Sequence, residues 1–476
     1  MAILPMSEAF ADIEQLVVAR PGPTEPLDLS SCVEEALQAN EFLSAERLRM
    51  SELHGQMKQA LSTGLPTLDF VGDWTRSRDP SMALDSTFGG SGDAFLPPPT
   101  SEEWFLEWLS GFGSLIPPAA DIPSQSFLRA NLNLNWTVNP WKIKGAIGAA
   151  SLGIDRQEQA IRSSENRTAE QTITSYYGII QAAEKVAAVR AQILDQRELL
   201  NILQMRHELG MVTRLDTLQA AVSLANLRPL LGIAEAGLRN AGAQLNAILG
   251  RDAEAPLSLL DEGEVETDSI DQGTALELAV NRPELLAQDR FTDILRRNRQ
   301  AQIAESRPYL TFGGAYGYVG TSTGDLFNEG HDSWRTSVAL NWSPFDGLLT
   351  RGRVAETNAM IRRSEVELSG NRRTVQVEVL QLLANLEMAR ELLAAVQLNL
   401  VRSEEALDET MLMLELGKAS YLDVLVAQSN RAQALGSVID ARYEVFSLTA
   451  SLKRSLGWSP LVPLVEIPDL VPEVVQ

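Results

Sequence analysis

Two kinds of hydrophobic periodicity alternate along this chain. Four segments carry an apolar residue at every second position, a pattern typical of β-strands with one buried face. They lie around Leu68–Trp74, Leu128–Val138, Leu310–Tyr318 and Trp334–Trp342, and several of their apolar residues are aromatic. Longer segments carry apolar residues three and four positions apart, which is typical of amphipathic helices. The sequence therefore predicts two pairs of strands separated by helices.

The same order of elements occurs twice, because the chain contains an internal repeat. A set of Leu, Gly, Asp and Ala residues that begins at Leu209-Gly210 recurs 207 positions later, from Leu416-Gly417. The tripeptide Leu134-Asn135-Trp136 returns in the second half as Leu340-Asn341-Trp342. Each half is predicted to form a helix, a strand, a loop, a strand, a long helix, a tight turn and a returning helix.

The second strand of each pair is predicted to lead directly into a long helix. Asn139-Pro140 and Ser343-Pro344 each supply a cap residue followed by proline at the first helical position. At 1.5 Å per residue, the segments from Pro140 to Leu209 and from Pro344 to Leu416 give helices of roughly 100 Å. Such lengths exceed what a globular core uses.

A seam with three- and four-residue spacing runs along each long helix and indicates coiled-coil packing. Both seams have a polar residue at the same place. The first consists of Ile179, Ala182, Val186, Val189, Ile193, Gln196, Leu200 and Leu203, and the second of Leu386, Ala389, Leu393, Val396, Leu400, Ser403, Leu407 and Thr410.

The other helices are about half as long. The returning helices are predicted at about Thr213 to Leu249 and Ser420 to Leu456, and the opening helices at about Ser31 to Ser62 and Thr274 to Glu305. One opening and one returning helix together nearly equal one long helix. Each half is therefore predicted to place one continuous rod beside a rod of two stacked pieces, and a wall of such rods around a lumen is a tunnel.

The strands allow two interpretations. Their alternation suits a half-buried sheet in a soluble protein, and it also suits the wall of a membrane barrel with a wet interior. Four strands cannot close such a barrel, because the smallest known ones have about eight. The second interpretation therefore requires several chains to share one barrel.

Composition narrows the class of protein. With 476 residues and 45% hydrophobic residues, the chain has enough material for a core. Its formal net charge of −23 argues against a nucleic-acid partner. No apolar run approaches the ~18 residues of a membrane-spanning helix.

The N-terminal region shows no basic segment followed by an apolar run, so no signal peptide is visible. Cys32 is the only cysteine, which excludes an internal disulfide. Leu29-Ser30-Ser31-Cys32 superficially matches a lipoprotein cleavage site, but the preceding residues 21–26 are not an apolar signal core.

Catalytic chemistry leaves no recognisable pattern. His54, His207 and His331 lie far apart, and no histidine, cysteine and carboxylate residues have the spacing of metal ligands. We expect no enzymatic activity, no metal site and no cofactor.

The turns that follow the long helices carry the candidate functional residues. They read Gly210-Met211-Val212-Thr213-Arg214-Leu215-Asp216 and Gly417-Lys418-Ala419-Ser420-Tyr421-Leu422-Asp423. Glycine suits the left-handed residue after a helix, and Thr or Ser three residues before Asp makes a capping box. A second role is compatible with the first, since carboxylates from several chains at one constriction would select cations and hold a gate.

Two segments resemble TolC-like outer-membrane efflux proteins. They are Trp342-Ser343-Pro344-Phe345-Asp346-Gly347 and the turn from Leu416 to Leu425, and the duplicated layout is similar from about Leu27 to Trp458. The resemblance implies a mainly α fold with a small β part. A long coiled-coil α-barrel would continue into a shared transmembrane β-barrel, to which each of three chains gives four strands.

The resemblance also implies partners and site residues. It predicts a homotrimer in the outer membrane that contacts lipid, extends into the periplasm and works with a periplasmic adaptor and an inner-membrane pump. Asp216 and Asp423 would form the gate. The adaptor would contact the tip residues Leu209, Gly210, Met211, Leu416, Gly417 and Lys418.

The expected organisation follows from the repeat. It comprises an N-terminal extension at 1–26, a first repeat at 27–250, an acidic connector at 251–273, a second repeat at 274–457 and a tail at 458–476. The Gly/Pro-rich insertion from Ser81 to Ser126 is expected to be an extracellular loop, because it joins two strands at the end opposite the helices.

Two functions remain open at this point. The first is a passive exit duct for efflux or type I secretion, driven by a partner pump, since no nucleotide-binding loop appears in the chain. The second is a soluble coiled-coil scaffold, which would also account for the missing signal peptide.

Overall fold

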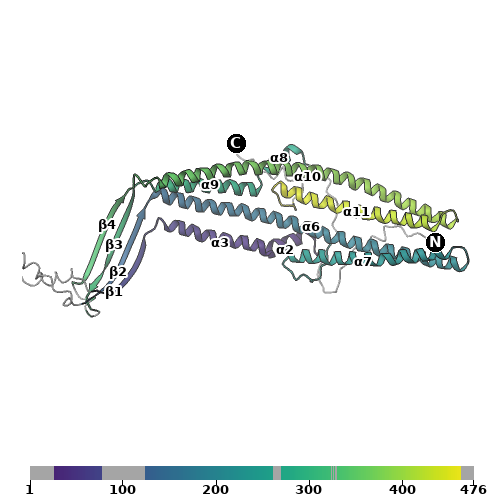
Figure 1. Ribbon diagram of the computed structural model, residues 1–476, viewed down its shortest axis with the longest axis horizontal. Coiled ribbons are helices and arrows are strands. Elements are labelled where there is room, and N and C mark those ends of the chain that lie inside the picture. Colours follow the sequence, from purple (N-terminus) through teal and green to yellow (C-terminus); the bar gives the residue numbers. More distant parts are fainter. Residues whose placement is uncertain are drawn as a thin grey trace, which may run out of the picture. The chain divides into compact units, whose positions relative to one another are not determined.

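The computed structural model describes residues 26–77, 124–260, 270–322, 324, 326 and 330–461. They belong to two compact units. Unit 1 comprises the described residues of Met1–Gly55, Ala149–Arg296 and Ala359–Gln476, and unit 2 those of Gln56–Gly148 and Arg297–Asn358. Figure 1 gives the element labels used below.

Unit 2 contains a four-stranded antiparallel sheet (Figure 1). Its strands pair in sequence order: β1 (Thr67–Ser77), β2 (Gln125–Val138), β3 (Tyr309–Gly320) and β4 (Asp332–Asn341). The strand pairs of the two repeats thus join through β2 and β3.

The two faces of this sheet differ in chemistry. The register places Leu68 opposite Leu134, Phe70 opposite Leu132 and Phe312 opposite Val338 on one face. Because side chains alternate along a strand, the residues between them lie on the other face. That face carries mainly small and polar residues, among them Asp69, Asp73, Asn131, Asn133, Asn135, Thr311 and Ser337.

Four helices form two antiparallel hairpins. The first hairpin is α6 (Pro140–Glu208) with α7 (Arg214–Ile248), and the second is α10 (Leu349–Glu415) with α11 (Tyr421–Ser455). Every residue of both predicted seams is buried or half-buried, so the coiled-coil prediction is confirmed. Among the described helices, none combines the length and the hydropathy that crossing a membrane requires.

The opening helices were wrongly predicted as continuous. The first is divided at Asn40 into α2 (Leu29–Ala39) and α3 (Glu41–Ser62), and the second into α8 (Gln272–Ala279) and α9 (Pro283–Ala304). In both cases a returning helix ends against the break. The Asn40 side chain donates to the Ile248 carbonyl of α7 (3.4 Å), and Gly457 after α11 packs against Arg282.

The start of α10 was also wrongly predicted. On the first long helix the prediction holds, because the Asn139 side chain accepts the Lys142 N–H (3.2 Å) and α6 begins at Pro140. On the second, α10 begins at Leu349 and not at Pro344. Gly347 and Leu348 adopt left-handed φ values of 67° and 71°, which end the extended segment in a turn before the helix can start.

Cys32 lies in the core of unit 1. It packs with Tyr176 of α6, Leu245 of α7 and Phe446 of α11, and burial raises the pKa of its thiol to about 11. The backbone just before it is engaged as well, since Leu27 pairs with Leu259 and Asp28 caps α2. These contacts give Cys32 and the residues before it a packing role.

Several predictions concern residues outside the described ones. The insertion from Ser81 to Ser126 falls almost entirely on residues 78–123, and residues 261–269 of the acidic connector also lie outside. The extension before residue 26 and the tail after residue 461 also lie outside.

Gly317 of β3 provides a test of the sheet register. A Cβ atom at this position would lie 2.2 Å from the Ala130 carbonyl and 2.3 Å from Asn131 Oδ1. We expect Gly317→Ala to destabilise the folded protein by about 1–3 kcal/mol, because β2 would have to shift. The measurement is the thermal unfolding midpoint of the purified protein.

Gly314→Ala is the matched control, since its Cβ would meet only the Leu134 side chain, at 3.6 Å. Equal midpoints for the two variants would contradict the register of β2 on β3.

Candidate functional site

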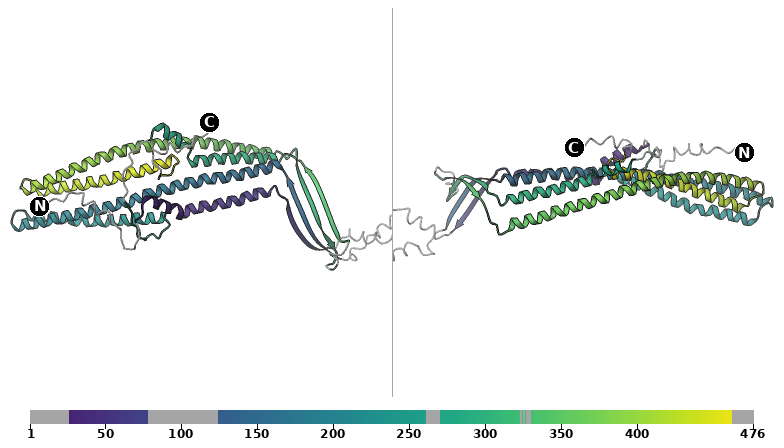
Figure 2. Two further views of the ribbon diagram at one scale, coloured as in Figure 1. Left: turned by 180° about the vertical axis from the view of Figure 1, so that it is seen from behind. Right: turned by 90° about the horizontal axis from the view of Figure 1, so that it is seen from above.

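The candidate site consists of the two turns that close the helical hairpins. Both turns lie at the same end of unit 1 (Figures 1 and 2). Beside them, Leu203, Ala220, Leu407 and Tyr421 belong to one buried cluster that joins the hairpins. The structure thus brings the two turn motifs of the repeat into one region.

Each turn has the geometry that its glycine predicts. Gly210 and Gly417 have φ values of 71° and 70°. The next residue closes each helix, because Met211 donates its N–H to the Arg206 carbonyl and Lys418 to the Met413 carbonyl, both at 2.8 Å. A side chain at either glycine would meet no atom within 4 Å, so backbone conformation alone favours glycine here.

Asp216 and Asp423 form the predicted capping boxes. One carboxylate oxygen of Asp216 accepts from the Thr213 N–H (2.9 Å) and hydroxyl (2.7 Å). Asp423 does the same with the Ser420 N–H (2.8 Å) and hydroxyl (2.7 Å). The Ser420 bonds lower the pKa of Asp423 below its usual value. Each carboxylate is thus held by its own turn, on an exposed helix end.

The predicted tip contacts are exposed and largely apolar. Leu209 is 74% exposed, Met211 70% and Leu416 60%, and Lys418 is exposed as well. Large apolar side chains at this exposure are unusual on a free surface when they gather in one place. The first turn has an additional contact, since His207 Nδ1 lies 3.0 Å from the Val212 carbonyl oxygen.

Tyr421 and Gln196 form a contact that the sequence did not predict. The Gln196 side chain of α6 donates to the Tyr421 hydroxyl of α11 (3.0 Å) and to the Ala220 carbonyl of α7 (3.4 Å). Both side chains are only 3% exposed. A polar residue in the α6 seam was the one available signal, and its partner lies 225 residues away.

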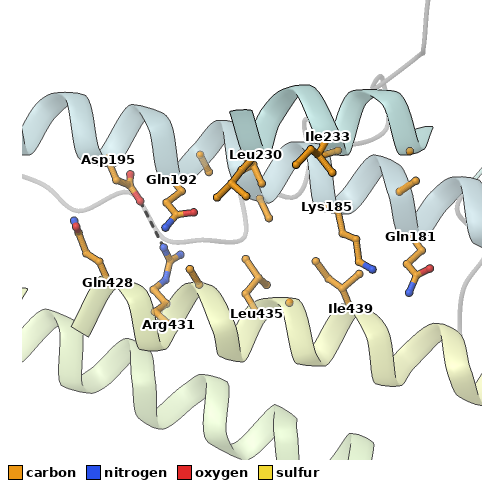
Figure 3. Close-up of a pocket in the computed structure, with 18 of the residues that line it drawn as sticks. Gln181, Lys185, Gln192, Asp195, Leu230, Ile233, Gln428, Arg431, Leu435 and Ile439 are labelled. Atoms are coloured by element: carbon orange, nitrogen blue, oxygen red, sulfur yellow. Dashed lines mark ion pairs between the residues drawn. The ribbon is translucent and has the colours of Figure 1, made fainter. Parts of the chain in front are cut away.

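A groove of about 630 Å³ lies between the first hairpin and α11 (Figure 3). Its walls are mostly apolar, and the labelled Leu230, Leu435 and Ile439 belong to them. The groove also has charged residues. Arg431 pairs with Asp195 (3.6 Å) and Glu404 (3.5 Å), and burial raises the pKa of Asp195.

Within the described part of the chain, no group of three or more histidine, cysteine or acidic side chains could hold a metal ion. The site therefore consists of helix ends, fixed carboxylates and exposed apolar side chains.

Comparison with known proteins identifies the chain's relatives. The family model for outer membrane efflux proteins matches residues 32–251 and 276–458. The outer membrane efflux protein BepC of Brucella suis is 21% identical over 342 residues, which cover 71% of this chain and 74% of BepC. The alkaline protease secretion protein AprF of Pseudomonas aeruginosa is 23% identical over 309 residues, or 63% of each chain.

Solved structures have the same fold. The outer membrane protein VceC of Vibrio cholerae superposes with a TM-score of 0.71 at 18% identity, over 90% of this chain and 96% of VceC. Because the family model matches both repeats, the chain belongs to the outer membrane efflux protein family.

Proposed function

We propose that this chain is one protomer of a homotrimeric exit duct, which conducts cargo passively while a partner pump supplies the energy. It resides in the outer membrane and extends into the periplasm, as its family implies. BepC is named for efflux and AprF for protease secretion, and the proposal covers both kinds of cargo. The observation that carries it is the large apolar surface that stays exposed in the described part of the chain.

The sheet leaves its apolar face exposed. Phe70 is 73% exposed, Trp334 72% and Leu340 70%. A soluble protein would bury such a face, whereas lipid is a suitable environment for it. In the described sheet, β1 and β4 pair on one side only. Edges of this kind join those of other copies when strands are shared, and three copies would supply twelve strands.

The helices have a corresponding unpaired surface, revealed by the repeat. In α6, the face from Glu170 to Ala188 packs on α11. Tyr177 stacks on Phe446 with ring centroids 4.1 Å apart, and Lys185 pairs with Asp440 at 2.5 Å. This is the contact between the first and second hairpins.

Within the described residues, the equivalent face of α10 is exposed. On α10, the residues that lie 207 positions after those of the α6 face form an apolar stripe. This stripe consists of Val377, Leu380, Ala384, Met388, Leu392 and Ala395. Met388 is 62% exposed and Leu392 52%. By analogy with the α6–α11 contact, this stripe would pack on α7 of another copy.

A change of chemistry on α7 supports this pairing. Asp440, which pairs with Lys185, corresponds to Ile233 in the first repeat. Lys185 itself corresponds to Leu392. An ion pair inside the chain is thus replaced by two apolar residues, of which Ile233 is 69% exposed. Both members of the pair are charged inside the chain and apolar at the equivalent positions, as two surfaces that pack on each other require.

The assembly is tested by substituting Leu392 and Ile233 with the charged residues found at the equivalent positions of the contact inside the chain. We expect Leu392→Lys and Ile233→Asp, each alone, to weaken association at least about tenfold, because each buries an unpaired charge. The double variant should recover association, since it recreates the Lys185–Asp440 pair between copies. The measurement is the oligomeric state by sedimentation in detergent. Trimers of unchanged stability in both single variants would refute the interface.

The aspartates of the tip are proposed to form a gate. In a trimer, Asp216 and Asp423 would contribute six carboxylates to one constriction, and such a ring selects cations. The capping boxes support this role, because the bonds from Thr213 and Ser420 hold each carboxylate in a fixed position.

Conductance of the Asp216→Asn, Asp423→Asn double variant tests the gate. Asparagine can still cap a helix, so the fold should persist while the ring loses its charge. We expect cation preference in planar bilayers to fall toward that of a neutral pore. Selectivity equal to the wild type would leave capping as the whole role of both residues.

The single variant Asp216→Asn leaves Asp423 as the one charged gate candidate in each chain, so the pH dependence of its cation preference provides a control. Because the pKa of Asp423 is lowered, this carboxylate stays charged as pH falls to its ordinary value near 3.8, and it becomes neutral only below that. Cation preference of the single variant should therefore hold from pH 7 to about pH 4 and be lost below it.

The exposed tip is proposed to bind the periplasmic adaptor. Leu209, Met211 and Leu416 offer apolar contact at the end of unit 1, and Gly210 and Gly417 hold their turns. Lys418 adds one positive charge.

Polar substitution of the tip tests adaptor binding. We expect Leu209→Ser with Leu416→Ser to weaken adaptor binding by about tenfold or more, because two exposed anchors are lost. Leu48→Ser, which also changes an exposed leucine in unit 1, is the control. The measurement is the Kd for the periplasmic adaptor protein of the proposed assembly, and equal Kd values in all three proteins would contradict the contact.

A further inference from the structure

The helix ends and turns of unit 2 are basic in a chain that is strongly acidic. Outside its strands, the described part of this unit has eight lysine or arginine residues and three acidic residues, although the whole chain has a formal charge of −23. The lysines and arginines, here called the basic cluster, are Lys58, Lys142, Lys144, Arg297, Arg299, Arg307, Arg351 and Arg353. The acidic residues are Glu305, Asp346 and Glu356.

Two tryptophans mark the boundary between the sheet and the helical segments that carry this cluster. The Trp136 indole donates to the Gly64 carbonyl (2.9 Å), and the Trp342 indole to the Ser306 carbonyl (3.2 Å). Both therefore stand where the strands meet the helical segments, and they are 38% and 61% exposed. Tryptophan is enriched at the level of lipid headgroups, where one end of the ring is apolar and the other hydrated.

Much of the positive charge in the cluster is not neutralised by carboxylates. Glu305 serves two cations, Lys142 at 3.6 Å and Arg353 at 2.8 Å. The Arg307 guanidinium lies over the Trp141 ring, 5.1 Å from its centroid. Among the described residues, Lys144 and Arg351 are exposed and have no ion pair.

We infer that the basic cluster binds the phosphates of anionic phospholipids in the membrane leaflet next to the helices. This inference rests on the proposed function, because it requires the apolar sheet face to lie in a bilayer. Exposed cations on the helical segments that adjoin these tryptophan-bearing strand ends match a negative headgroup layer in charge and in depth. The occupant is thus a lipid headgroup. The cations bind its phosphate, while the tryptophans and the apolar sheet face contact the rest of the lipid.

Quenching of tryptophan fluorescence by brominated lipid tests the inference on the full chain in phosphatidylcholine vesicles. Brominated phosphatidylglycerol and brominated phosphatidylcholine are compared, and the ratio of quenching gives the preference for the anionic lipid. We expect the wild type to prefer phosphatidylglycerol, and K144Q/R307Q/R351Q to lose that preference. Each removed charge should lower it by up to about fivefold.

A matched variant controls for net charge. R228Q/R362Q/R402Q removes three exposed arginines from helices of unit 1 and should keep the wild-type preference. Equal preferences in the two triple variants would overturn the inference. If the first triple variant fails to insert, K144Q alone should still lower the preference, and a wild-type preference in K144Q would overturn the inference as well.

Two further outcomes would overturn the inference. Loss of the wild-type preference in sodium phosphate, but not in sodium chloride of equal ionic strength, would indicate a site for free phosphate. A change of ion selectivity in K144Q/R307Q/R351Q with unchanged lipid preference would place the cations in the lumen. Conductance of the wild type in the same vesicles tests the proposed duct separately. A protein that conducts but shows no preference for phosphatidylglycerol would refute the lipid inference alone, whereas a protein that does not conduct would refute the duct.

Discussion

Apolar surface that a single chain cannot cover is the constraint on which this molecule depends. The sheet carries Phe70, Trp334 and Leu340 on an open face, and α10 carries Met388 and Leu392 on an open stripe. Exposed apolar area costs free energy in water in proportion to its size, about 25 cal/mol per Å². Both surfaces are exposed in the described part of the chain, and lipid and further copies are the environments that we propose to cover them.

Comparison of the two repeats shows how equivalent helices can make different contacts, one inside the chain and one proposed with another copy. Within the chain, α6 meets α11 through Lys185 and Asp440, together with the stacked Tyr177 and Phe446. In the second repeat, leucine replaces the lysine and alanine replaces the tyrosine. Duplicated segments that kept the same partners would have no reason to diverge at these positions. Their divergence therefore favours different partners for α6 and α10.

Local physics made much of this fold predictable. The seams, the strand faces and the capping boxes of Asp216 and Asp423 depend on residues close in sequence, and the structure has all of them. The breaks in the opening helices were missed because the ends of the returning helices cause them, at Asn40 and Arg282. At α10, Gly347 and Leu348 outweighed the Ser343-Pro344 cap. The Gln196–Tyr421 bond was beyond prediction, since its members lie 225 positions apart.

The proposed gating role of the tip aspartates depends on their role as helix caps. A carboxylate on a free side chain would sample many rotamers, and its charge would be spread over a wide volume. The capping box removes that freedom, because the N–H and hydroxyl of Thr213 or Ser420 hold one oxygen of each aspartate. The same bonds lower the pKa of Asp423 and so keep its charge in mildly acidic surroundings. A capping aspartate thus has the fixed position that a selective constriction requires, and the capping role is a precondition of the proposed gate.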